Sequence, residues 1–318
     1  MSHSVEIFAK WLSCQGYRIE RTKSSWWYNV YSLAWQSFPY HWIIEPEEEE
    51  LREFLVKVHG AGLRYSTGLN SPYGKLSYHA VFEGKNYDLD ILSQNARHNV
   101  RRGLRRCKIE QITFDRLAEE GWVLQVKTLQ RQRRKVRISR NKWHKLCLSA
   151  ADLPGFEAWG ALVNGKLVAS VITFQMDDCC YMLYQQCDER YLRRYINNAL
   201  SFVVTKEMLS RPHIKSILYG LHSIDAPPNV DEFKFRMGYW PKPVKQRVVF
   251  HPILEPVFNR MTHRFLRWLT HVFPGQCFFS KAEGFVRFGL DSKIPTEQQD
   301  WPIAFRIHGR MKERIEKK

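Results

Sequence analysis

The chain has 318 residues, of which 44% are hydrophobic and 14% aromatic, and its formal net charge is +17. This composition supplies a sizeable core and excludes an intrinsically disordered chain. No uncharged run approaches the roughly 18 residues of a membrane-spanning helix, which excludes a helical membrane protein. The seven cysteines lack C-x-x-C spacing and the histidines form no H-E-x-x-H motif, so we predict reduced thiols, a cytoplasmic location and no metal site.

The first 92 residues combine aromatic, strand-like runs with one clear helix. Glu45-Pro46 and four further glutamates begin that helix, because proline and acids suit its N-terminal end. Its apolar residues recur at helical spacing and predict one buried face: Leu51, Phe54, Leu55 and Val58. Further on, 81–92 is predicted to form two strands around a Gly84-Lys85 turn.

A strongly basic segment follows. From Arg97 to Lys145 there are sixteen Lys and Arg but only four acids, and Lys127–Lys145 contains no acid. Asn95–Cys107 is predicted to be a helix, whose arginines lie four residues apart along one side. Such a block attracts RNA, the phosphates of CoA, anionic lipid or an acidic polysaccharide. The alternative is a solvated basic face that aids solubility.

The next elements form a predicted meander, a helix and two further strands. Asn164-Gly165 is a strong hairpin turn between two strand-like runs, and Asp177-Asp178 is the turn before a third. A helix at 192–209 follows, and a short helix ends at Gly238. The predicted strands are Glu157–Val163, Leu167–Gln175, Cys179–Cys187, Ile214–Tyr219 and Val244–Phe250.

This order of elements resembles the GNAT acyltransferase fold. Phe233-Lys234-Phe235-Arg236-Met237-Gly238-Tyr239 resembles the F-K-x-x-x-G segment of Fem-type aminoacyltransferases, and Asn95–Cys107 resembles their Arg-rich helix. Acetyl-CoA enzymes bind pyrophosphate with a glycine-containing loop, but Arg190–Ala199 has no glycine, as in Fem-like proteins. The resemblance covers about half of the chain, 92–251.

The resemblance implies an α/β (α+β) fold of two GNAT-like units, of which the C-terminal one is complete. We therefore expect a degenerate N-terminal unit at 1–92, an acyltransferase domain at 93–251 and a helical extension at 252–318. No internal repeat is visible in the sequence, so the duplication rests on the resemblance alone.

In GNAT-like folds the reacting carbon lies where the two central parallel strands splay apart, here 181–186 and 214–219 by analogy. Polar residues at these strand ends are the candidates, and a buried tyrosine with a satisfied hydroxyl is the ordinary alternative. The catalytic candidates are Tyr184, Asp188 and His222, with Asp225 as a further base. The binding candidates are Gln185, Gln186 and Tyr219.

The Fem-like resemblance implies that Lys234 contacts the donor or the substrate, with Arg236 as a neighbouring cation; both could equally be surface cations. Asn197 and Asn198 open the helix where other GNAT enzymes place glycines, and they bind donor or cap the helix. The arginines expected to bind a polyanionic donor are Arg97, Arg101, Arg102 and Arg105.

The extension begins with a basic amphipathic helix at 254–273. Its apolar side includes Phe265 and Trp268, and its basic residues include Arg260, Arg264 and Arg267. A helix of this kind docks on its parent domain or lies on an anionic membrane.

We therefore predict an acyltransferase that uses acyl-CoA or aminoacyl-tRNA and no metal. The acceptor is an amine of a cell-envelope precursor, a sugar or a peptide. One alternative is an acetyl-CoA-type transferase for a sugar amine or a small metabolite. Another is a non-catalytic RNA- or polyanion-binding protein that has kept the fold. An enzyme needs an open cleft with polar strand ends, whereas a binding protein would fill the cleft with aromatic side chains beside a flat basic face.

Overall fold

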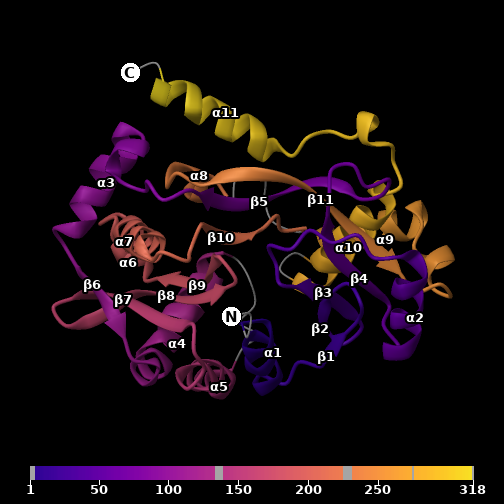
Figure 1. The fold of residues 1–318 in the computed structure, drawn as a ribbon, viewed down its shortest axis with the longest axis horizontal. Coiled ribbons are helices and arrows are strands. Elements are labelled where there is room, and N and C mark those ends of the chain that lie inside the picture. Colours follow the sequence, from indigo (N-terminus) through magenta and orange to yellow (C-terminus); the bar gives the residue numbers. More distant parts are fainter. Residues whose placement is uncertain (1–3, 133–138, 225–230, 274–275, 317–318) are drawn as a thin grey trace.

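The computed structural model describes residues 4–132, 139–224, 231–273 and 276–316 (Figure 1). In these residues one mixed sheet of eleven strands runs in the order β1-β2-β3-β4-β11-β5-β10-β9-β8-β7-β6. Two neighbouring pairs are parallel, β3 with β4 and β9 with β10, and the other neighbours are antiparallel. The sheet therefore contains two similar arrangements, each with a parallel pair.

The N-terminal half supplies five strands and two helices. α2 packs its predicted apolar side against the sheet, where Leu51, Phe54, Leu55 and Val58 are buried with Trp35. His59 ends the helix in the left-handed conformation, with φ 51°. The elements are α1 Ser4–Cys14, β1 Ile19–Arg21, β2 Trp26–Tyr31, β3 Ala34–Phe38, α2 Glu48–Val58, β4 Gly62–Thr67 and β5 Lys75–Glu83.

The C-terminal half supplies the rest of the sheet. Figure 1 shows α3 and α7 on one side of β6–β9, and α4 and α5 on the other, where α1 also packs. The elements are a 3-10 turn at Leu89–Ile91, α3 Gln94–Leu104, β6 Lys108–Ile112, α4 Phe114–Arg131, α5 Arg140–Ala151, β7 Phe156–Val163, β8 Lys166–Met176, β9 Cys179–Cys187, α6 Glu189–Leu192, α7 Ile196–Ser210, β10 Ser216–Leu221, α8 Glu232–Arg236 and β11 Trp240–Phe250.

The two halves exchange strands in the middle of the sheet. β11, the last strand in the described residues, lies between β4 and β5 of the N-terminal half. β5 in turn pairs on its other edge with β10 of the C-terminal half. Hydrogen bonds of both halves therefore cross the predicted division of the chain, and the boundaries at 92 and 251 stay a prediction.

The extension consists of helices that cover one end of the sheet and α8. α10 packs on β11 through Phe250, Phe285 and Phe288. α11 lies over α8 and β5, where Ala304 and Phe305 contact Tyr78 and Phe235 (Figure 1). The elements are a 3-10 turn at Glu255–Val257, α9 Arg260–Val272, α10 Cys277–Asp291, a 3-10 turn at Thr296–Gln298 and α11 Ile303–Glu316.

The pattern of the C-terminal half is confirmed, including the hairpin at Asn164-Gly165, whose residues have φ 50° and 75°. Three predicted elements differ from the structure. The helix predicted at 254–273 is divided into a 3-10 turn and α9, because Asn259 takes an extended conformation and caps α9. The helix predicted at 192–209 is divided into α6 and α7, because Tyr195 takes the left-handed conformation with φ 62°. The second strand predicted within 81–92 is wrong, because Asp88 accepts a hydrogen bond from the Leu89 N–H and begins a 3-10 turn.

Gly103 lets α3 approach α7 closely. A Cβ on this residue would lie 2.4 Å from the Tyr195 carbonyl oxygen and 2.8 Å from the Ala199 Cβ. We expect Gly103→Ala to lower the free energy of unfolding by about 1–2 kcal/mol, because overpacking outweighs the better helix propensity of alanine. Urea denaturation measures this difference.

Gly309→Ala is the matched control, because a Cβ on this α11 residue would have no heavy atom within 4 Å. It should leave stability unchanged or raise it by up to ~1 kcal/mol. Equal effects of the two substitutions would mean that the α3–α7 contact does not need the glycine.

Candidate active site

The parallel strands β9 and β10 pair over a short length and then separate. In the described residues their ladder joins Cys179–Tyr181 to Ser216–Leu218 and ends there. On its other edge β10 stays paired with β5 as far as Leu221. β10 is thus held by β5 while β9 turns away, so the two strands splay apart between residues 182–185 and 219–221.

A bulge in β9 widens this opening. The pairing of β9 with β8 shifts after Leu183, and Tyr184 in the bulge has φ 44°. This conformation is uncommon for a residue with a Cβ, and bulges re-aim side chains. The Tyr184 ring accordingly leaves the sheet and meets Trp11 and Trp143 edge-on, with ring centroids 6.2 Å away in both cases.

A cavity of about 430 Å³ lies at the splay. Aromatic rings line much of it, but they do not fill it. The Tyr40 hydroxyl donates to the Tyr28 hydroxyl at 2.9 Å, and His41 Nδ1 lies 2.7 Å from the Tyr181 hydroxyl. The lining residues from the strands are Tyr28, Val30, Gln36, Tyr181–Tyr184 and Leu218–Leu221, and those from α1 and its surroundings are Phe8, Trp11, Leu12, Tyr17 and Tyr40.

Polar side chains form a chain across the strand ends, on the side of α7 and α8. The Lys234 ammonium lies 5.1 Å from the centroid of the Tyr219 ring. The Tyr219 hydroxyl donates to Gln185 Oε1, and Gln185 Nε2 donates to Asn197 Oδ1 at 2.8 Å. Asn198 Nδ2 lies 3.4 Å from the sulfur of Met237. The structure thus brings together five residues named from the sequence.

The Lys234 ammonium lies over β10 and is held there by an ion pair. A Cβ on Gly220 would lie 3.6 Å from Lys234 Nζ, so the ammonium lies directly over β10. Lys234 also forms an ion pair of 2.6 Å with Asp231, whose other oxygen accepts a hydrogen bond of 2.6 Å from the Tyr78 hydroxyl. The Lys234 side chain is 18% exposed and that of Asp231 is 4% exposed. The cation is therefore positioned at the opening by a buried carboxylate.

Asp231 and Tyr78 are residues that the sequence analysis did not single out. Asp231 stands three residues before Lys234 at the start of α8, which is a spacing that brings side chains together on a helix. That spacing is the signal that could have found it. Tyr78 is 153 residues away in the sequence, and burial raises its pKa, as does the neighbouring Asp231 carboxylate.

The two predicted bases have other partners. Asp188 caps α6 and forms ion pairs with Lys127 at 2.9 Å and Arg190 at 2.7 Å, and the hydrogen bond from Arg190 lowers the pKa of its carboxyl group well below the ordinary value. His222 stacks on Tyr78 and lies 3.1 Å from the Ser77 hydroxyl. Burial, with the charge of Arg64, lowers the pKa of His222 to about 4. Neither group is therefore placed as a strong base at the splay.

Two of the remaining predicted residues have partners away from the polar chain. Gln186 is buried and joins Ser170 to Gln125 of α4. Arg236 is an exposed partner of Glu232. Asp225 lies outside the described residues.

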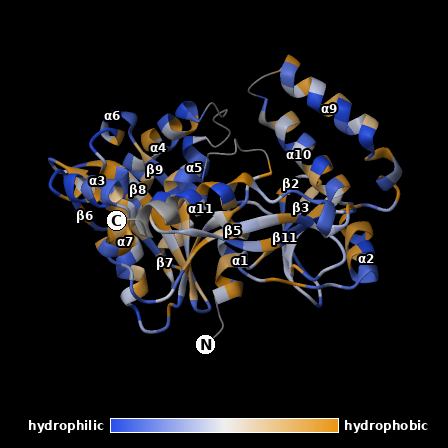
Figure 2. Cartoon of the chain, turned by 90° about the horizontal axis from the view of Figure 1, so that it is seen from above, coloured by the Kyte–Doolittle hydropathy of each residue, from blue (hydrophilic) through white to orange (hydrophobic). Residues whose placement is uncertain are grey.

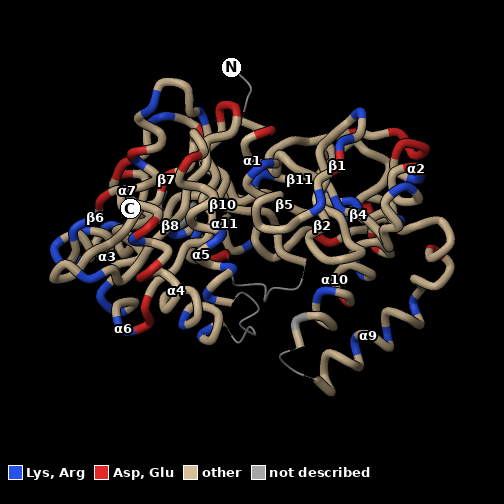
Figure 3. The backbone as a smooth tube through the Cα atoms, turned by 90° about the horizontal axis from the view of Figure 1, so that it is seen from below, with Lys and Arg blue, Asp and Glu red and all other residues tan. Residues whose placement is uncertain are grey.

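The four arginines are on α3, which packs on α7. Arg102 lies over the ring of Tyr195, with its guanidinium carbon 5.2 Å from the ring centroid, and Tyr195 is the residue that begins α7. Arg97 and Arg101 line a shallow hollow, and Arg105 is exposed. Figure 3 shows the basic residues along α3 on one end of the molecule.

No protein-family model matches the chain, and no curated protein matches its sequence. Solved structures do match. FemX superposes with a TM-score of 0.54 at 8% identity, over 79% of this chain and 93% of that one. The chain has the fold of FemX.

Two further structures share the FemX fold. L-PGS from Bacillus licheniformis matches with a TM-score of 0.51 at 12% identity, over 79% of this chain and 92% of that one. The C-terminal domain of an Agrobacterium fabrum protein assigned as a lysylphosphatidylglycerol synthetase gives a TM-score of 0.51 at 10% identity, over 76% and 89% of the two chains. The predicted α/β fold with a helical extension is confirmed.

Two features are absent from the described residues of this FemX-like chain. None of its described helices combines the length and the apolar character needed to cross a membrane. Within the same residues no three His, Cys, Asp or Glu side chains lie close enough to hold a metal ion.

The buried His222 predicts a loss of stability in acid. Its pKa is about 4 in the folded chain and 6.5 as the ordinary value, so between these pH values only the unfolded chain binds the proton. Stability is therefore lost as the pH falls through this window, by about 1.4 kcal/mol per pH unit for one such group. We expect His222→Gln to reduce the pH slope of the unfolding free energy by that amount.

Urea denaturation of both proteins across this range measures the slope. Above about pH 7.5 the difference between them should be constant, because neither state of the wild type takes up the proton there. An unchanged slope in the variant would show that His222 does not stay neutral in the folded chain.

Proposed function

We propose that the chain is an acyltransferase that joins an acyl or aminoacyl group to an amine at the splay of β9 and β10. The observation that carries this proposal is the opening of two parallel strands that are buried elsewhere, with a bulge at Tyr184 and a cavity at the opening. An acyl group placed between the strands has the backbone of β9 beside it, because in the described residues the pairing of β9 with β10 ends at Tyr181.

The reaction needs positioning rather than covalent machinery. The amine nitrogen attacks the acyl carbonyl carbon, a C–N bond forms, and the C–O bond of an ester donor or the C–S bond of a thioester breaks. The proton lost by the amine is taken up by the oxygen or sulfur of the leaving group. The protein contributes by aligning the two reactants and by stabilising the negative charge on the carbonyl oxygen.

Lys234 is the proposed source of that stabilisation. Its ammonium lies over Gly220 at the opening, and the ion pair with Asp231 keeps it there. Tyr219 and Gln185 extend the polar edge toward Asn197 at the start of α7. The N-terminal end of α7 carries partial positive charge, so this edge suits a donor that bears phosphate.

The donor is proposed to be polyanionic, either aminoacyl-tRNA or acyl-CoA. The basic helix α3 borders the same end of α7 through the contact of Arg102 with Tyr195. A donor whose phosphates bind α3 can therefore extend its acyl group past Asn197 into the splay. One of the structures that share the fold is named as a lysylphosphatidylglycerol synthetase. That name refers to a lysyl group, which favours an aminoacyl group as the group transferred by this chain.

The acceptor is proposed to enter from the cavity on the other side of the strands. Its aromatic lining and its few hydroxyl groups suit an amine on an extended carrier, such as a cell-envelope precursor, an amino sugar or a peptide. The lining also favours a second candidate, a protein that binds polyanions through α3 without catalysis. The space that remains in the cavity favours the enzyme.

The role of Lys234 is tested by Lys234→Met. We expect turnover to fall by ~10²-fold or more, because one group that stabilises developing charge is lost. Aminoacyl-tRNAs and acyl-CoAs are first screened as donors with amine acceptors, and the variant is then assayed with the productive pair. Circular dichroism and thermal unfolding check that it stays folded.

Arg236→Met is the matched control, since Arg236 lies on the same helix but its side chain is 59% exposed and pairs with Glu232. It should keep most of the activity. If neither donor class gives turnover while tRNA still binds, the binding protein replaces the enzyme as the proposed function. Equal losses in the two variants would remove Lys234 from the site.

The donor surface is tested by reversing charge on α3 with Arg101, Arg102 and Arg105 changed to Glu. We expect tRNA or CoA binding to be lost, and added salt to weaken binding of the wild type progressively. Filter binding or fluorescence anisotropy at low salt measures both effects.

The matched control changes Arg260, Arg264 and Arg267 to Glu, which alters net charge equally but on α9. Its binding should weaken only slightly, through the general loss of charge. If both triple variants bind alike, the basic residues act through net charge alone and α3 is not the donor surface.

A further inference from the structure

α9 is held to the protein by one side only. Its Leu266 and Leu269 are half-buried on the side toward α10, and His263 forms an ion pair of 2.9 Å with Glu283 of α10. Between α9, α10 and strands β2–β3 lies a cavity of about 480 Å³, which Thr262 and Leu266 help to line. α9 therefore does not pack directly against the sheet, and it has no buried residues.

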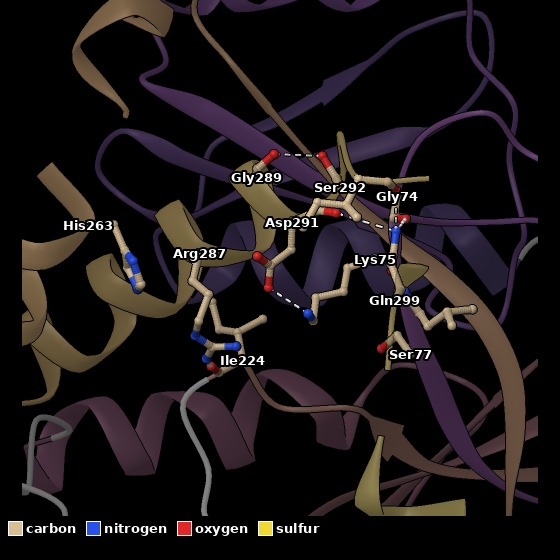
Figure 4. Close-up of polar contacts among 12 residues, drawn as sticks. Gly74, Lys75, Ser77, Ile224, His263, Arg287, Gly289, Asp291, Ser292 and Gln299 are labelled. Atoms are coloured by element: carbon tan, nitrogen blue, oxygen red, sulfur yellow. Dashed lines mark hydrogen bonds and ion pairs between the residues drawn. The ribbon is translucent and has the colours of Figure 1, made fainter. Parts of the chain in front are cut away.

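α10, by contrast, is firmly anchored (Figure 4). Lys75 of β5 forms an ion pair of 2.5 Å with Asp291, and Arg287 donates to the Ile224 carbonyl oxygen at 2.7 Å. Gln299 ties the following turn to the Gly74 carbonyl oxygen at 3.0 Å. α9 thus packs on a helix that is itself bonded to the rest of the protein, and it lies at the edge of the molecule in Figure 2.

The outer side of α9 is an apolar stripe in solvent. Met261, Phe265, Trp268 and Val272 recur at steps of four, three and four residues, and they are 77%, 57%, 56% and 45% exposed. Large apolar side chains also stand exposed in the flanking segments: Ile253, Val257, Phe273 and Phe278. A row of large exposed apolar side chains on one side of a helix marks an interaction surface.

A row of cations runs beside the stripe. Arg260, Arg264 and Arg267 are exposed, and none of the three forms an ion pair with a carboxylate of the described residues. α9 contains no acid, and the nearby Glu255 and Glu283 are paired with Lys293 and with His263 and Arg287. Figure 3 shows these basic positions along α9.

We propose that α9 binds the surface of an anionic lipid bilayer. Met261, Phe265, Trp268 and Val272 enter the boundary between headgroups and acyl chains, and Arg260, Arg264 and Arg267 contact the lipid phosphates. Apolar burial and charge attraction then act on the two neighbouring sides of one helix, as interfacial helices require. This binding is independent of the proposed transfer reaction.

The charge pattern favours a bilayer over the other occupants. Two copies that joined through this stripe would bring their arginine rows near each other, and no acid on α9 could compensate them. A protein partner would have to match an apolar stripe with a separate row of acids. An anionic bilayer supplies apolar chains and phosphates at every position along the helix.

The test is flotation of the full chain with two kinds of vesicle, phosphatidylcholine alone and phosphatidylcholine with about one quarter phosphatidylserine. We expect the protein to float with the anionic vesicles. The double variant Phe265→Ser, Trp268→Ser should lose at least ~10-fold in vesicle partitioning, because two inserted side chains are removed. Its matched control is Val123→Ser, Trp301→Ser, which changes side chains that are 52% and 49% exposed elsewhere.

A second variant changes Arg260, Arg264 and Arg267 to Gln. It should also lose binding, and its remaining binding should depend less on salt. The same change at Arg101, Arg102 and Arg105 should have a smaller effect. Since all of these residues lie at the surface, the variants should fold, which circular dichroism checks.

Three outcomes overturn the proposal. The wild type fails to float with anionic vesicles, the double variant floats as well as the wild type, or the two arginine variants lose binding equally. Light scattering adds a further outcome against it: a wild-type dimer that does not float, and that the double variant converts to a monomer, assigns the stripe to a second copy.

Discussion

The antiparallel pair of β5 and β11 is the constraint on which the rest of the structure depends. β11 ends the C-terminal half of the sheet yet lies next to β4, and β5 belongs to the N-terminal half yet holds β10 as far as Leu221. Because β10 is fixed along this edge and meets β9 over only three residue pairs, the separation falls between β9 and β10. The exchange thus places the splay of β9 and β10 beside residues of the N-terminal half.

The polar groups at the splay come from both halves of the sheet, because β5 lies next to β10 and β11. The Asp231 carboxylate pairs with Lys234, which belongs to the same C-terminal half. It also accepts a hydrogen bond from the hydroxyl of Tyr78 on β5, in the N-terminal half. A buried carboxylate with two partners avoids the penalty of an unpaired charge. The position of Lys234 over Gly220 therefore depends on Tyr78, a residue of β5 that is distant in sequence but contacts α8.

Much of the fold and part of the site could be predicted from residue order. The Asn164-Gly165 hairpin, the apolar side of α2 and the glycine that follows α8 all depend on local rules of turns and periodicity. Lys234 is predicted from the resemblance of its segment to F-K-x-x-x-G, and Tyr219 and Asn197 are predicted from their places at a strand end and at a helix start. Asp188 and His222 were named on the same ground, but their contacts with Arg190 and Tyr78 come from packing, which residue spacing does not encode.

The sequence by itself determined most of the elements, the basic α3 and the amphipathic character of α9, because these are properties of neighbouring residues. Only the tertiary structure decided that β11 enters the N-terminal half, that β9 bulges at Tyr184, and that Asp231 and Tyr78 meet. It also decided that the apolar stripe of α9 faces solvent while Leu266 faces the protein. The physical reason is that strand partners and the covered side of a helix depend on contacts between distant residues, whereas turns, caps and periodicity depend on near ones.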